Sequence, residues 1–591
     1  MAKRLLTGNE AIALGAHLAG ARVVAGYPGT PSTEIIETLV REDYPEVYAE
    51  WAPNEKVALE VVIGASLSGV RAMATMKHVG VNVAADPLMT VTYMGVRGGL
   101  VIVTADDPGM HSSQNEQDNR NYARFAKVPM LEPSDSQEAQ DMTVRAFALS
   151  ETYDTPVFVR STTRISHTLT AVEPGEPVAD HPEPGFVRDQ KKLVMIPVNA
   201  RERHPAVEDR LEKLRAFVEE ADDLNRIEWR DRSVGVVTGG IAYQYVREAL
   251  PDASVLKLGI SYPIPLEMIR SFAAQVDRLY VIEELDPFWE SQMREAGIRV
   301  TGKEIIPLTG ELTPDIIRRA VECADEHQAG VVRGPRVDSE VPGRPPMLCP
   351  GCPHRGVFYV LNRLKMIVTG DIGCYTLGVM PPLAAMDTCT CMGASIGAAM
   401  GIEKALGEDA PDTVAVIGDS TFLHSGMTAL ADVAYNGGNV TTIILDNHST
   451  AMTGHQGNPA SGYDARMQPA PRVNFGAVTR SLGIEDVQTV DPYDLSAVEE
   501  AVRRARDGAG PSVIIADRAC ALLDRKSREA PYSVTEECAA CGMCLALGCP
   551  ALFRTGDGEG PATIDPSLCT GCGMCAQVCG FDAIVREDDV S

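Results

Sequence analysis

Short apolar runs alternate along most of the chain with longer stretches in which apolar residues recur at helical spacing. Buried strands are predicted for the apolar runs at 99–107, 157–160, 233–237 and 279–283. The glycine pair at 239–240 leads into a predicted helix at 243–250, and we interpret the pair as a tight turn, because the full GxGxxG pattern of a nucleotide site is missing. This alternation of strands and helices predicts an α/β fold of several doubly wound layers.

Shifts in composition predict four domains. The charged, proline-bearing stretches at 172–185 and 326–346 are typical of linkers. Domains are therefore expected at 1–190, 232–325, 347–525 and 530–591. At the start of the chain, Thr7, Asn9 and Glu10 interrupt the apolar stretch, which favours a capped first helix over a signal sequence. No apolar run of about 18 residues occurs, so no membrane span is expected.

Two predicted strands in the third domain are followed by polar residues that could bind a ligand. The apolar runs at 413–417 and 440–445, with a helix near 427–435 between them, predict a βαβ unit with parallel strands. Asp419 and Asn447 follow the two strands, so both are expected at the carboxyl edge of the sheet, where open α/β sheets bind ligands. Their oxygens suit Mg²⁺, and Gly418 would let the backbone approach a diphosphate closely.

Eight of the 15 cysteines lie close to the end of the chain. They form two runs, Cys538, Cys541, Cys544 with Cys549, and Cys569, Cys572, Cys575 with Cys579. This is the spacing of a ferredoxin with two 4Fe–4S clusters, in which the last cysteine of each run binds the other cluster. The alternatives are a zinc ribbon and a disulfide knot, but eight cysteines in triplets exceed what zinc needs. Cluster cysteines must stay reduced, which favours the cytoplasm.

Overall charge excludes one class of partner. The formal net charge is −28, and no basic stripe or P-loop occurs, which argues against nucleic acid binding. Hydrophobic residues make up 45% of the chain, enough for complete cores, whereas aromatic residues make up only 5%. That balance is typical of α/β layers with many tight loops.

The third domain resembles thiamine diphosphate enzymes. Gly418-Asp419-Ser420, followed after residues 421–446 by Asn447, is similar to their signature. The resemblance implies that Asp419, Asn447 and the carbonyl of Ser449 hold the magnesium ion. The segment MGASIG at 392–397 resembles the glycine-rich stretch before the diphosphate, where Met392 and Gly393 would meet the cofactor. The alternatives are an ordinary pair of strand-end turns and a core methionine.

A thiamine enzyme also needs a carboxylate against the aminopyrimidine ring. The helix opening NEKVAL at 54–59 is similar to the glutamate segment of the family, which implies Glu55 in that role, with Glu60 as the second choice. The alternative for Glu55 is a glutamate that only stabilises the helix dipole.

The whole chain resembles the 2-oxoacid:ferredoxin oxidoreductases, and among them the large, alpha subunits that act on indolepyruvate. The resemblance rests on GYPGTPSTE, KHVGVNVAADPL, HSSQNEQDNR, CPGCPHRG, MGASIG and LDNHSTAMTGHQ, which begin at residues 26, 77, 111, 349, 392 and 445. It implies oxidative decarboxylation of an arylpyruvate with coenzyme A, and electron transfer through 4Fe–4S clusters to ferredoxin. It also implies a smaller beta subunit, hence a hetero-oligomer.

The same resemblance implies further site residues. Thr30, and either Arg120 or Arg124, would contact the oxoacid, with Lys77 and His78 along the same cleft; His78 could equally be a core histidine. A third 4Fe–4S cluster would be held by four cysteines outside the ferredoxin runs, Cys349, Cys352, Cys374 and Cys520. The alternative is a set of buried free cysteines. We interpret Cys323, Cys389 and Cys391 as structural.

Two other functions stay open at this point. A pyruvate or 2-oxoglutarate ferredoxin oxidoreductase would differ only in its substrate pocket. A non-catalytic electron-transfer subunit is the alternative from another class, although the presence of Glu55, Asp419 and Asn447 argues against it.

Overall fold

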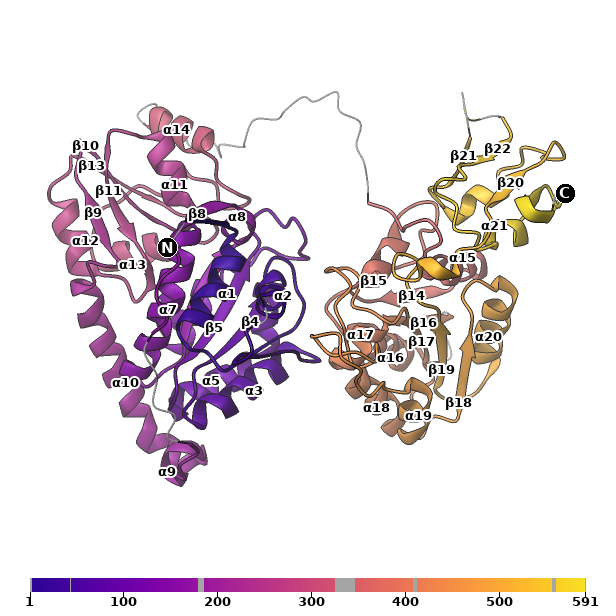
Figure 1. The fold of residues 1–591 in the computed structure, drawn as a ribbon, viewed down its shortest axis with the longest axis horizontal. Coiled ribbons are helices and arrows are strands. Elements are labelled where there is room, and N and C mark those ends of the chain that lie inside the picture. Colours follow the sequence, from indigo (N-terminus) through magenta and orange to yellow (C-terminus); the bar gives the residue numbers. More distant parts are fainter. Residues whose placement is uncertain are drawn as a thin grey trace. The chain divides into compact units, whose positions relative to one another are not determined.

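The computed structural model describes residues 3–42, 44–178, 185–324, 346–407, 412–554, 558 and 560–589. The chain divides into two compact units, Met1–Ser339 and Glu340–Ser591 (Figure 1). The predicted linker at 326–346 lies outside the described residues except for Pro346, as do residues 179–184 of the other linker. The four domain limits stay predictions.

The first unit is built on a seven-stranded sheet. Its order is β12 (Ile260–Tyr262), β6 (Met130–Leu131), β7 (Val157–Thr162), β5 (Leu100–Asp106), β4 (Ala72–Lys77), β2 (Val23–Gly26) and β3 (Tyr48–Trp51). All neighbours run parallel except β12, which pairs with β6 in the antiparallel sense. The strands predicted at 99–107 and 157–160 are confirmed as β5 and β7.

Strands of this sheet are apolar on both faces, because helices cover both. Val101 and Val103 of β5 pack with α1 (Gly8–Leu18), α2 (Glu34–Arg41) and α7 (Ser136–Tyr153). Leu100 and Ile102, which point the other way, pack with α3 (Glu55–Leu67), α4 (His78–Val83), α5 (Ala85–Met94) and α6 (Arg120–Ala126). Helix α1 begins with a capping box, in which Thr7 Oγ1 accepts from Glu10 N (3.2 Å) and Glu10 accepts from Thr7 N (3.0 Å). The predicted capped first helix is confirmed.

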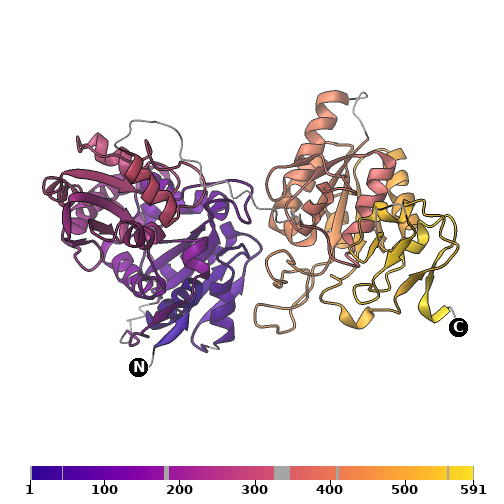
Figure 2. The same cartoon turned by 90° about the horizontal axis from the view of Figure 1, so that it is seen from above.

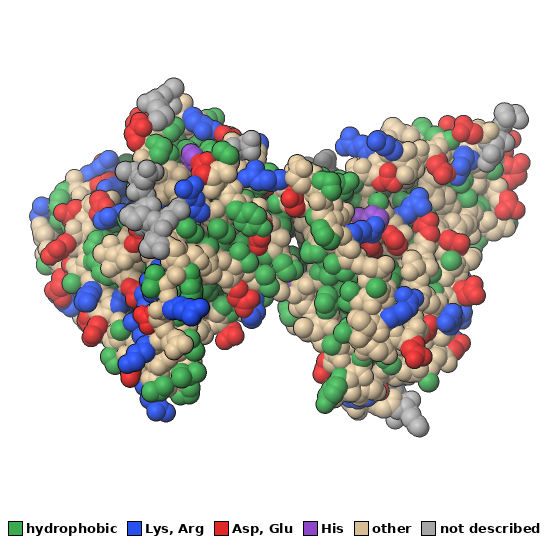
Figure 3. Space-filling view, turned by 60° about the horizontal axis from the view of Figure 1, so that its bottom comes forward, with side chains coloured by type: hydrophobic (Ala, Val, Ile, Leu, Met, Phe, Trp, Pro, Cys, Tyr) green, Lys and Arg blue, Asp and Glu red, His purple; other side chains and the backbone are tan. Residues whose placement is uncertain are grey.

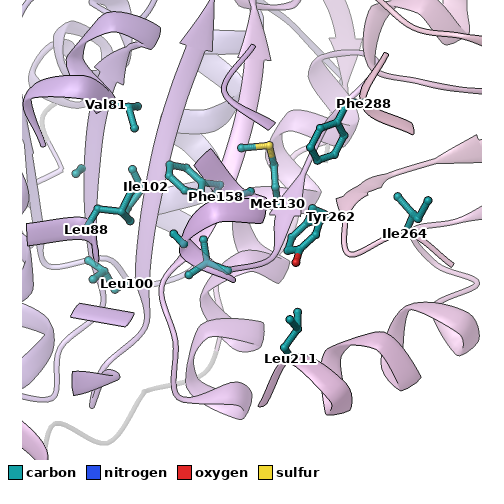
Figure 4. Close-up of a cluster of buried hydrophobic side chains, with 14 of the residues drawn as sticks. Val81, Leu88, Leu100, Ile102, Met130, Phe158, Leu211, Tyr262, Ile264 and Phe288 are labelled. Carbon is teal, nitrogen blue, oxygen red and sulfur yellow. The ribbon is translucent and has the colours of Figure 1, made fainter. Parts of the chain in front are cut away.

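A second sheet of the same unit shares this core. Its order is β13 (Arg278–Ile282), β10 (Asp231–Gly239), β11 (Ala253–Leu258) and β9 (Arg226–Glu228). Around it lie α10 (Pro197–Glu220), α11 (Gly240–Ala249), α12 (Leu266–Ala273), α13 (Phe288–Glu295) and α14 (Pro314–Cys323), whereas α9 (Gln190–Leu193) packs against α5 and α10. Figure 4 shows Leu211, Tyr262, Ile264 and Phe288 in one apolar cluster with Leu100 of the first sheet. Gly240, at φ +52°, makes the predicted strand-to-helix turn.

Buried ion pairs join the two sheets of the first unit. Arg120, only 1% exposed, donates to Asp118 (2.9 Å) and to Glu283 at the end of β13 (2.7 Å). Its guanidinium also lies over the Trp289 ring, 4.9 Å from the centroid. Nearby, Arg160 pairs with Asp106 (2.8 Å). Asp118, Glu283 and Asp106 thus each have an arginine partner, without which their burial would be strongly unfavourable.

The second unit contains a six-stranded parallel sheet. Its order is β15 (Thr388–Cys389), β14 (Ile367–Gly370), β16 (Thr413–Gly418), β17 (Thr441–Asp446), β19 (Ser512–Asp517) and β18 (Asp486–Val490). Helices α15 (His354–Leu364) and α20 (Leu495–Asp507) cover one face, and α16 (Ala394–Leu406), α18 (Met427–Tyr435) and α19 (Phe475–Ser481) the other. The predicted βαβ unit is confirmed as β16, α18 and β17.

The cysteine-rich C-terminal module packs on the face of α15 and α20. It has two small antiparallel strand pairs, β20 (Tyr532–Val534) with β23 (Ile584–Arg586) and β21 (Leu552–Arg554) with β22 (Ala562–Ile564), and the short helices η6 (Met543–Leu547) and α21 (Met574–Gln577). Leu547 and Met574 belong to the same buried cluster as Phe358 of α15. Figure 2 shows the module in yellow beside the rest of this unit.

Surface charges of both signs are mixed. On the face in Figure 3, the described Lys and Arg side chains are scattered among Asp and Glu rather than gathered in a stripe. Among the described residues, no helix combines the length and apolar content that a membrane span requires.

Two arginines of α6 test how much the buried ion pairs stabilise the first unit. Arg120→Met leaves Asp118 and Glu283 buried without their cation, and we expect the unfolding free energy to fall by about 3–5 kcal/mol. Arg124, half-exposed and 3.6 Å from Glu295, is the matched control, and Arg124→Met should cost about 0–1 kcal/mol. Urea unfolding followed by circular dichroism measures both. Equal decreases in unfolding free energy for the two variants would show that the buried ion pairs stabilise the first unit no more than the exposed one.

Candidate functional site

Polar residues gather where parallel strands of the second unit end. Asp371 follows β14, Asp419 follows β16, and Asn447 follows β17. Because these strands are parallel neighbours, the three residues lie along one edge of the sheet. The structure therefore brings Asp419 and Asn447 together as the strand pattern predicts.

A single backbone N–H links the two predicted metal ligands. Ser449 N donates to Asp419 Oδ2 (3.1 Å) and to Asn447 Oδ1 (3.1 Å), after the chain reverses at His448, whose φ is +63°. Burial, with the nearby Asp446 carboxylate, raises the pKa of Asp419 to about 8. Among the described residues no Lys or Arg pairs with Asp419. A buried carboxylate and an amide oxygen that converge in this way fit a Mg²⁺ ion.

Neighbouring side chains leave no room for a side chain at Gly418 or Gly393. A side chain at Gly418 would meet the Tyr375 ring at 2.7 Å, so the ring occupies the space above that glycine. Ser420 Oγ accepts from Thr450 Oγ1 (2.9 Å). At Gly393, φ is +90° and a side chain would meet Ser425 Oγ at 2.4 Å. Gly393 is therefore needed for the turn into α16, and Ser425 Oγ in turn donates to the carbonyl of the half-buried Met392 (2.8 Å).

Asp371 is a residue that sequence reasoning missed. Its carboxylate accepts from Gly393 N (2.9 Å) and Ser395 N (3.2 Å) at the start of α16. Burial raises the pKa of Asp371 to about 6, although these N–H donors oppose the shift. The signal was present, because Asp371 directly follows an apolar strand just as Asp419 does. Asp371 holds the glycine-rich segment at this edge of the sheet.

Four cysteines of the second unit lie near one another beside this edge. Burial, with the neighbouring thiols of Cys374 and Cys349, raises the pKa of Cys352 to about 12. Burial, with Cys520 and Cys349, raises the pKa of Cys374 to about 11. The backbone N–H of Cys520 donates to the carbonyl of Asn447 (3.1 Å), so this set adjoins the predicted metal ligands. We refer to these four as the edge cysteine set.

The C-terminal module holds two further sets, in the predicted grouping. Burial raises the pKa of Cys544, and three thiols raise it further, those of Cys538, Cys541 and Cys579. Burial also raises the pKa of Cys575, with added repulsion from Cys572, Cys569 and Cys549. These four residues of the second set line one cavity. Iron binds the thiolate form, so a bound cluster would have to neutralise the converging charges that raise these pKa values.

The second set lies close to the edge cysteine set. A side chain at Gly351, between Cys349 and Cys352, would meet Thr570 Oγ1 at 2.1 Å. Tyr493 Oη donates to the Gly351 carbonyl (2.5 Å), and burial together with the thiols of Cys572 and Cys352 raises its pKa. Tyr493 therefore lies near a cysteine of each set.

In the first unit, the remaining predicted residues lie at the carboxyl edge of the seven-stranded sheet. Glu55, 5% exposed, opens α3 after β3, and Asn54 caps that helix by accepting from Val57 N (2.9 Å). A side chain at Gly80 would meet Glu55 Oε1 at 2.6 Å, so Gly80 makes room for the carboxylate. Thr30 follows β2 at the same edge and is half-buried. Glu60 is exposed and pairs with Lys56, which leaves Glu55 the better-placed carboxylate.

Lys77 and His78 differ in their surroundings. Burial lowers the pKa of Lys77 to about 8, although the nearby Asp107 and Glu55 carboxylates oppose the shift. Lys77 Nζ donates to the Ser112 carbonyl (2.6 Å). His78 is fully buried, with Nε2 3.1 Å from Asn115 Oδ1, which suits a core histidine.

The predicted role of Arg120 does not fit its environment. Its guanidinium is fully buried and engaged by Asp118 and Glu283, so it has no exposed face for a substrate carboxylate. Arg124, the alternative, is half-exposed and 3.6 Å from Glu295. Cys323, Cys389 and Cys391 are all exposed, and Cys389 Sγ donates to the Asp371 carbonyl (3.6 Å); their structural interpretation stays a prediction.

Three family descriptions match separate parts of the chain. Residues 371–516 match "Thiamine pyrophosphate enzyme, C-terminal TPP binding domain". Residues 14–208 match "Pyruvate flavodoxin/ferredoxin oxidoreductase, thiamine diP-bdg", and residues 562–585 match "4Fe-4S binding domain". Thiamine diphosphate and 4Fe–4S clusters are therefore the cofactors of this chain.

Curated relatives match almost the full chain. It is 41% identical to the indolepyruvate oxidoreductase subunit IorA of Archaeoglobus fulgidus, over 98% of this chain and 97% of that protein. It is 42% identical to the same subunit of Pyrococcus horikoshii, over 100% and 98%. The 2-oxoglutarate synthase subunit KorA of Methanocaldococcus jannaschii is 36% identical over 28% of this chain and 48% of that protein.

Iron content tests the edge cysteine set. Three four-iron clusters would give about 12 irons per chain, and Cys374→Ser should remove about four of them. Cys391→Ser changes a nearby exposed cysteine outside the set, so its iron content should equal that of the unmodified chain. Anaerobic iron and sulfide assays, with electron paramagnetic resonance of the reduced protein, measure the difference. About eight irons in all three proteins would show that the edge cysteines hold no cluster.

Proposed function

The chain belongs to the family of indolepyruvate oxidoreductase IorA subunits, and on that premise we propose that it catalyses oxidative decarboxylation of arylpyruvates. Coenzyme A would accept the acyl group, CO2 would be released, and two electrons would pass singly to ferredoxin. The observation that carries this proposal is the position of the edge cysteine set, which touches Asn447 through the Cys520 N–H. Electrons released at the cofactor would have an acceptor site next to it.

Several residues would hold the cofactors. Bound thiamine diphosphate supplies the chemistry that cleaves CO2 from a 2-oxoacid, and 4Fe–4S clusters supply one-electron acceptors. We propose that Asp419, Asn447 and the Ser449 carbonyl bind Mg²⁺, beside the Gly418 and Ser420 backbone. Met392 and Gly393, at the start of α16, would meet the cofactor's rings and diphosphate.

Residues of the first unit would handle protons and substrate. Glu55 is proposed as the carboxylate that meets the aminopyrimidine ring, because it is buried and positioned by Asn54 and Gly80. Thr30 is proposed as a contact of the oxoacid. Arg120 is proposed only to position its loop, since its guanidinium already binds Asp118 and Glu283.

The cysteine sets suggest an order for electron transfer. We propose that electrons pass from the edge cysteine set to the cluster of Cys549, Cys569, Cys572 and Cys575, because Gly351 and Thr570 are in direct contact there. The cluster of Cys538, Cys541, Cys544 and Cys579 would then face ferredoxin, since Cys541 is exposed.

Partners follow from the relatives. The relatives are named as subunits, so we propose that this chain works with a smaller beta subunit in a hetero-oligomer in the cytoplasm. A 2-oxoglutarate or pyruvate oxidoreductase is the second candidate, but the KorA similarity covers only 28% of this chain. A purely electron-transferring subunit would not need the buried Asp419 and Glu55.

An anaerobic assay of oxoacids tests the proposed function. The chain, isolated with its small subunit, should reduce ferredoxin with indolepyruvate and phenylpyruvate at least on the order of 10-fold better than with pyruvate or 2-oxoglutarate. Asp419→Ala should abolish the reaction and retain neither Mg²⁺ nor thiamine diphosphate. Preference for 2-oxoglutarate would assign the second candidate. Cofactor retained by Asp419→Ala would place the metal site elsewhere.

The glycine under Glu55 tests the carboxylate's role. Gly80→Ala places a methyl group 2.6 Å from Glu55 Oε1 and should lower kcat on the order of 10²-fold, approaching the loss of Glu55→Gln. Gly64→Ala, in α3, is the matched control, because a side chain there meets nothing within 4 Å. Cofactor binding should persist in all three variants. Normal kcat in Gly80→Ala and in Glu55→Gln would remove Glu55 from this role.

A further inference from the structure

His354 is a buried imidazole two residues after Cys352 of the edge cysteine set. It opens α15 and is 3% exposed. Its ring stacks edge-on against Tyr375, with centroids 5.9 Å apart. The Nε2 atom lies 3.3 Å from Asn447 Nδ2. A polar ring in this apolar region thus meets one of the residues proposed to bind Mg²⁺.

Hydrogen bonding around Asn447 decides which way its amide faces. Ser449 N–H points at Asn447 Oδ1 (3.1 Å), and an N–H can only donate, so the oxygen must lie on that side. The amide NH2 group then faces His354 and donates to Nε2. The reversed amide would set N–H against N–H at Ser449, so the Ser449 N–H selects the orientation. His354 matches it as the tautomer whose Nε2 carries the lone pair.

The orientation matters because only one end of an amide binds a hard cation. Mg²⁺ takes oxygen ligands, and an amide nitrogen offers it no lone pair. A flipped Asn447 would present NH2 to the ion beside Asp419. The main chain of Asn447 is held as well, because its carbonyl accepts from Cys520 N (3.1 Å). The remaining freedom is rotation of the side chain, and His354 restricts that rotation.

We propose that His354 is a positioning residue that holds the Asn447 carbonyl oxygen toward Mg²⁺ by accepting a hydrogen bond from its amide. This inference rests on the proposed magnesium and thiamine diphosphate site. It also gives a reason for the imidazole at this position, since an apolar residue would fill the same space without an acceptor. Outer groups that orient metal ligands typically change metal affinity 10–100-fold when they are removed.

Two substitutions of similar size distinguish the hydrogen-bond acceptor of His354 from the space that its side chain fills. His354→Gln keeps an acceptor oxygen, whereas His354→Met fills similar space with only a weak one. Mg²⁺ titrations of the full chain with its small subunit, at saturating thiamine diphosphate, give the dissociation constant by calorimetry. We expect His354→Met to raise it about 10–100-fold and His354→Gln to restore most of that loss. Iron content and thermal unfolding report on folding.

The outcomes separate this inference from the proposed function. Wild-type Mg²⁺ affinity in His354→Met, or equal losses in the two variants, would overturn the positioning role. If His354→Met contains less iron than the wild-type chain, its Mg²⁺ affinity is compared with that of wild-type chain from which the iron has been removed. The comparison then excludes an effect of cluster loss on Mg²⁺ binding. Failure of the wild-type chain itself to bind Mg²⁺ with thiamine diphosphate would instead refute the proposed site.

Discussion

Parallel pairing of β14, β16, β17 and β19 is the constraint on which the second unit depends. Parallel strands finish at one edge, so the residue after each strand arrives beside the residues after its neighbours. Asp371, Asp419 and Asn447 reach the same edge in this way, and Cys520 lies shortly beyond β19, although the four residues span about 150 positions of sequence. Short loops then place the acids, the amide and a thiol within one site. A shift in register would separate them.

Buried carboxylates of the two units have opposite surroundings, as Asp118 and Glu283 in the first unit and Asp419 in the second show. In the first unit, Asp118 and Glu283 both pair with Arg120, which connects the two sheets. In the second, Asp419 has backbone N–H donors but no basic partner among the described residues, and its pKa lies near 8 as a consequence of burial. The first arrangement stabilises without any ligand. The second is poised to gain stability when a divalent cation arrives.

Sequence reasoning identified the parts of the site that depend on local order. The βαβ unit from 413 to 446 has clear apolar strands, and cysteine spacing grouped the eight C-terminal thiols as the structure does. It failed where a role depends on distant partners. Arg120 could not be recognised as an ion-pair residue, because Glu283 is far away in sequence. His354 could not be recognised as a partner of Asn447, because the two residues lie far apart in sequence.

Leu547 and Met574 of the C-terminal module lie in the same buried cluster as Phe358 beneath the parallel sheet. A module that contributes to its neighbour's interior is not an interchangeable cassette, even though its cysteine pattern makes it look like one. Its loss would expose the apolar face of α15 and α20 to water. The electron-carrying and cofactor-binding parts of this unit should therefore fold, and be lost, as one cooperative body.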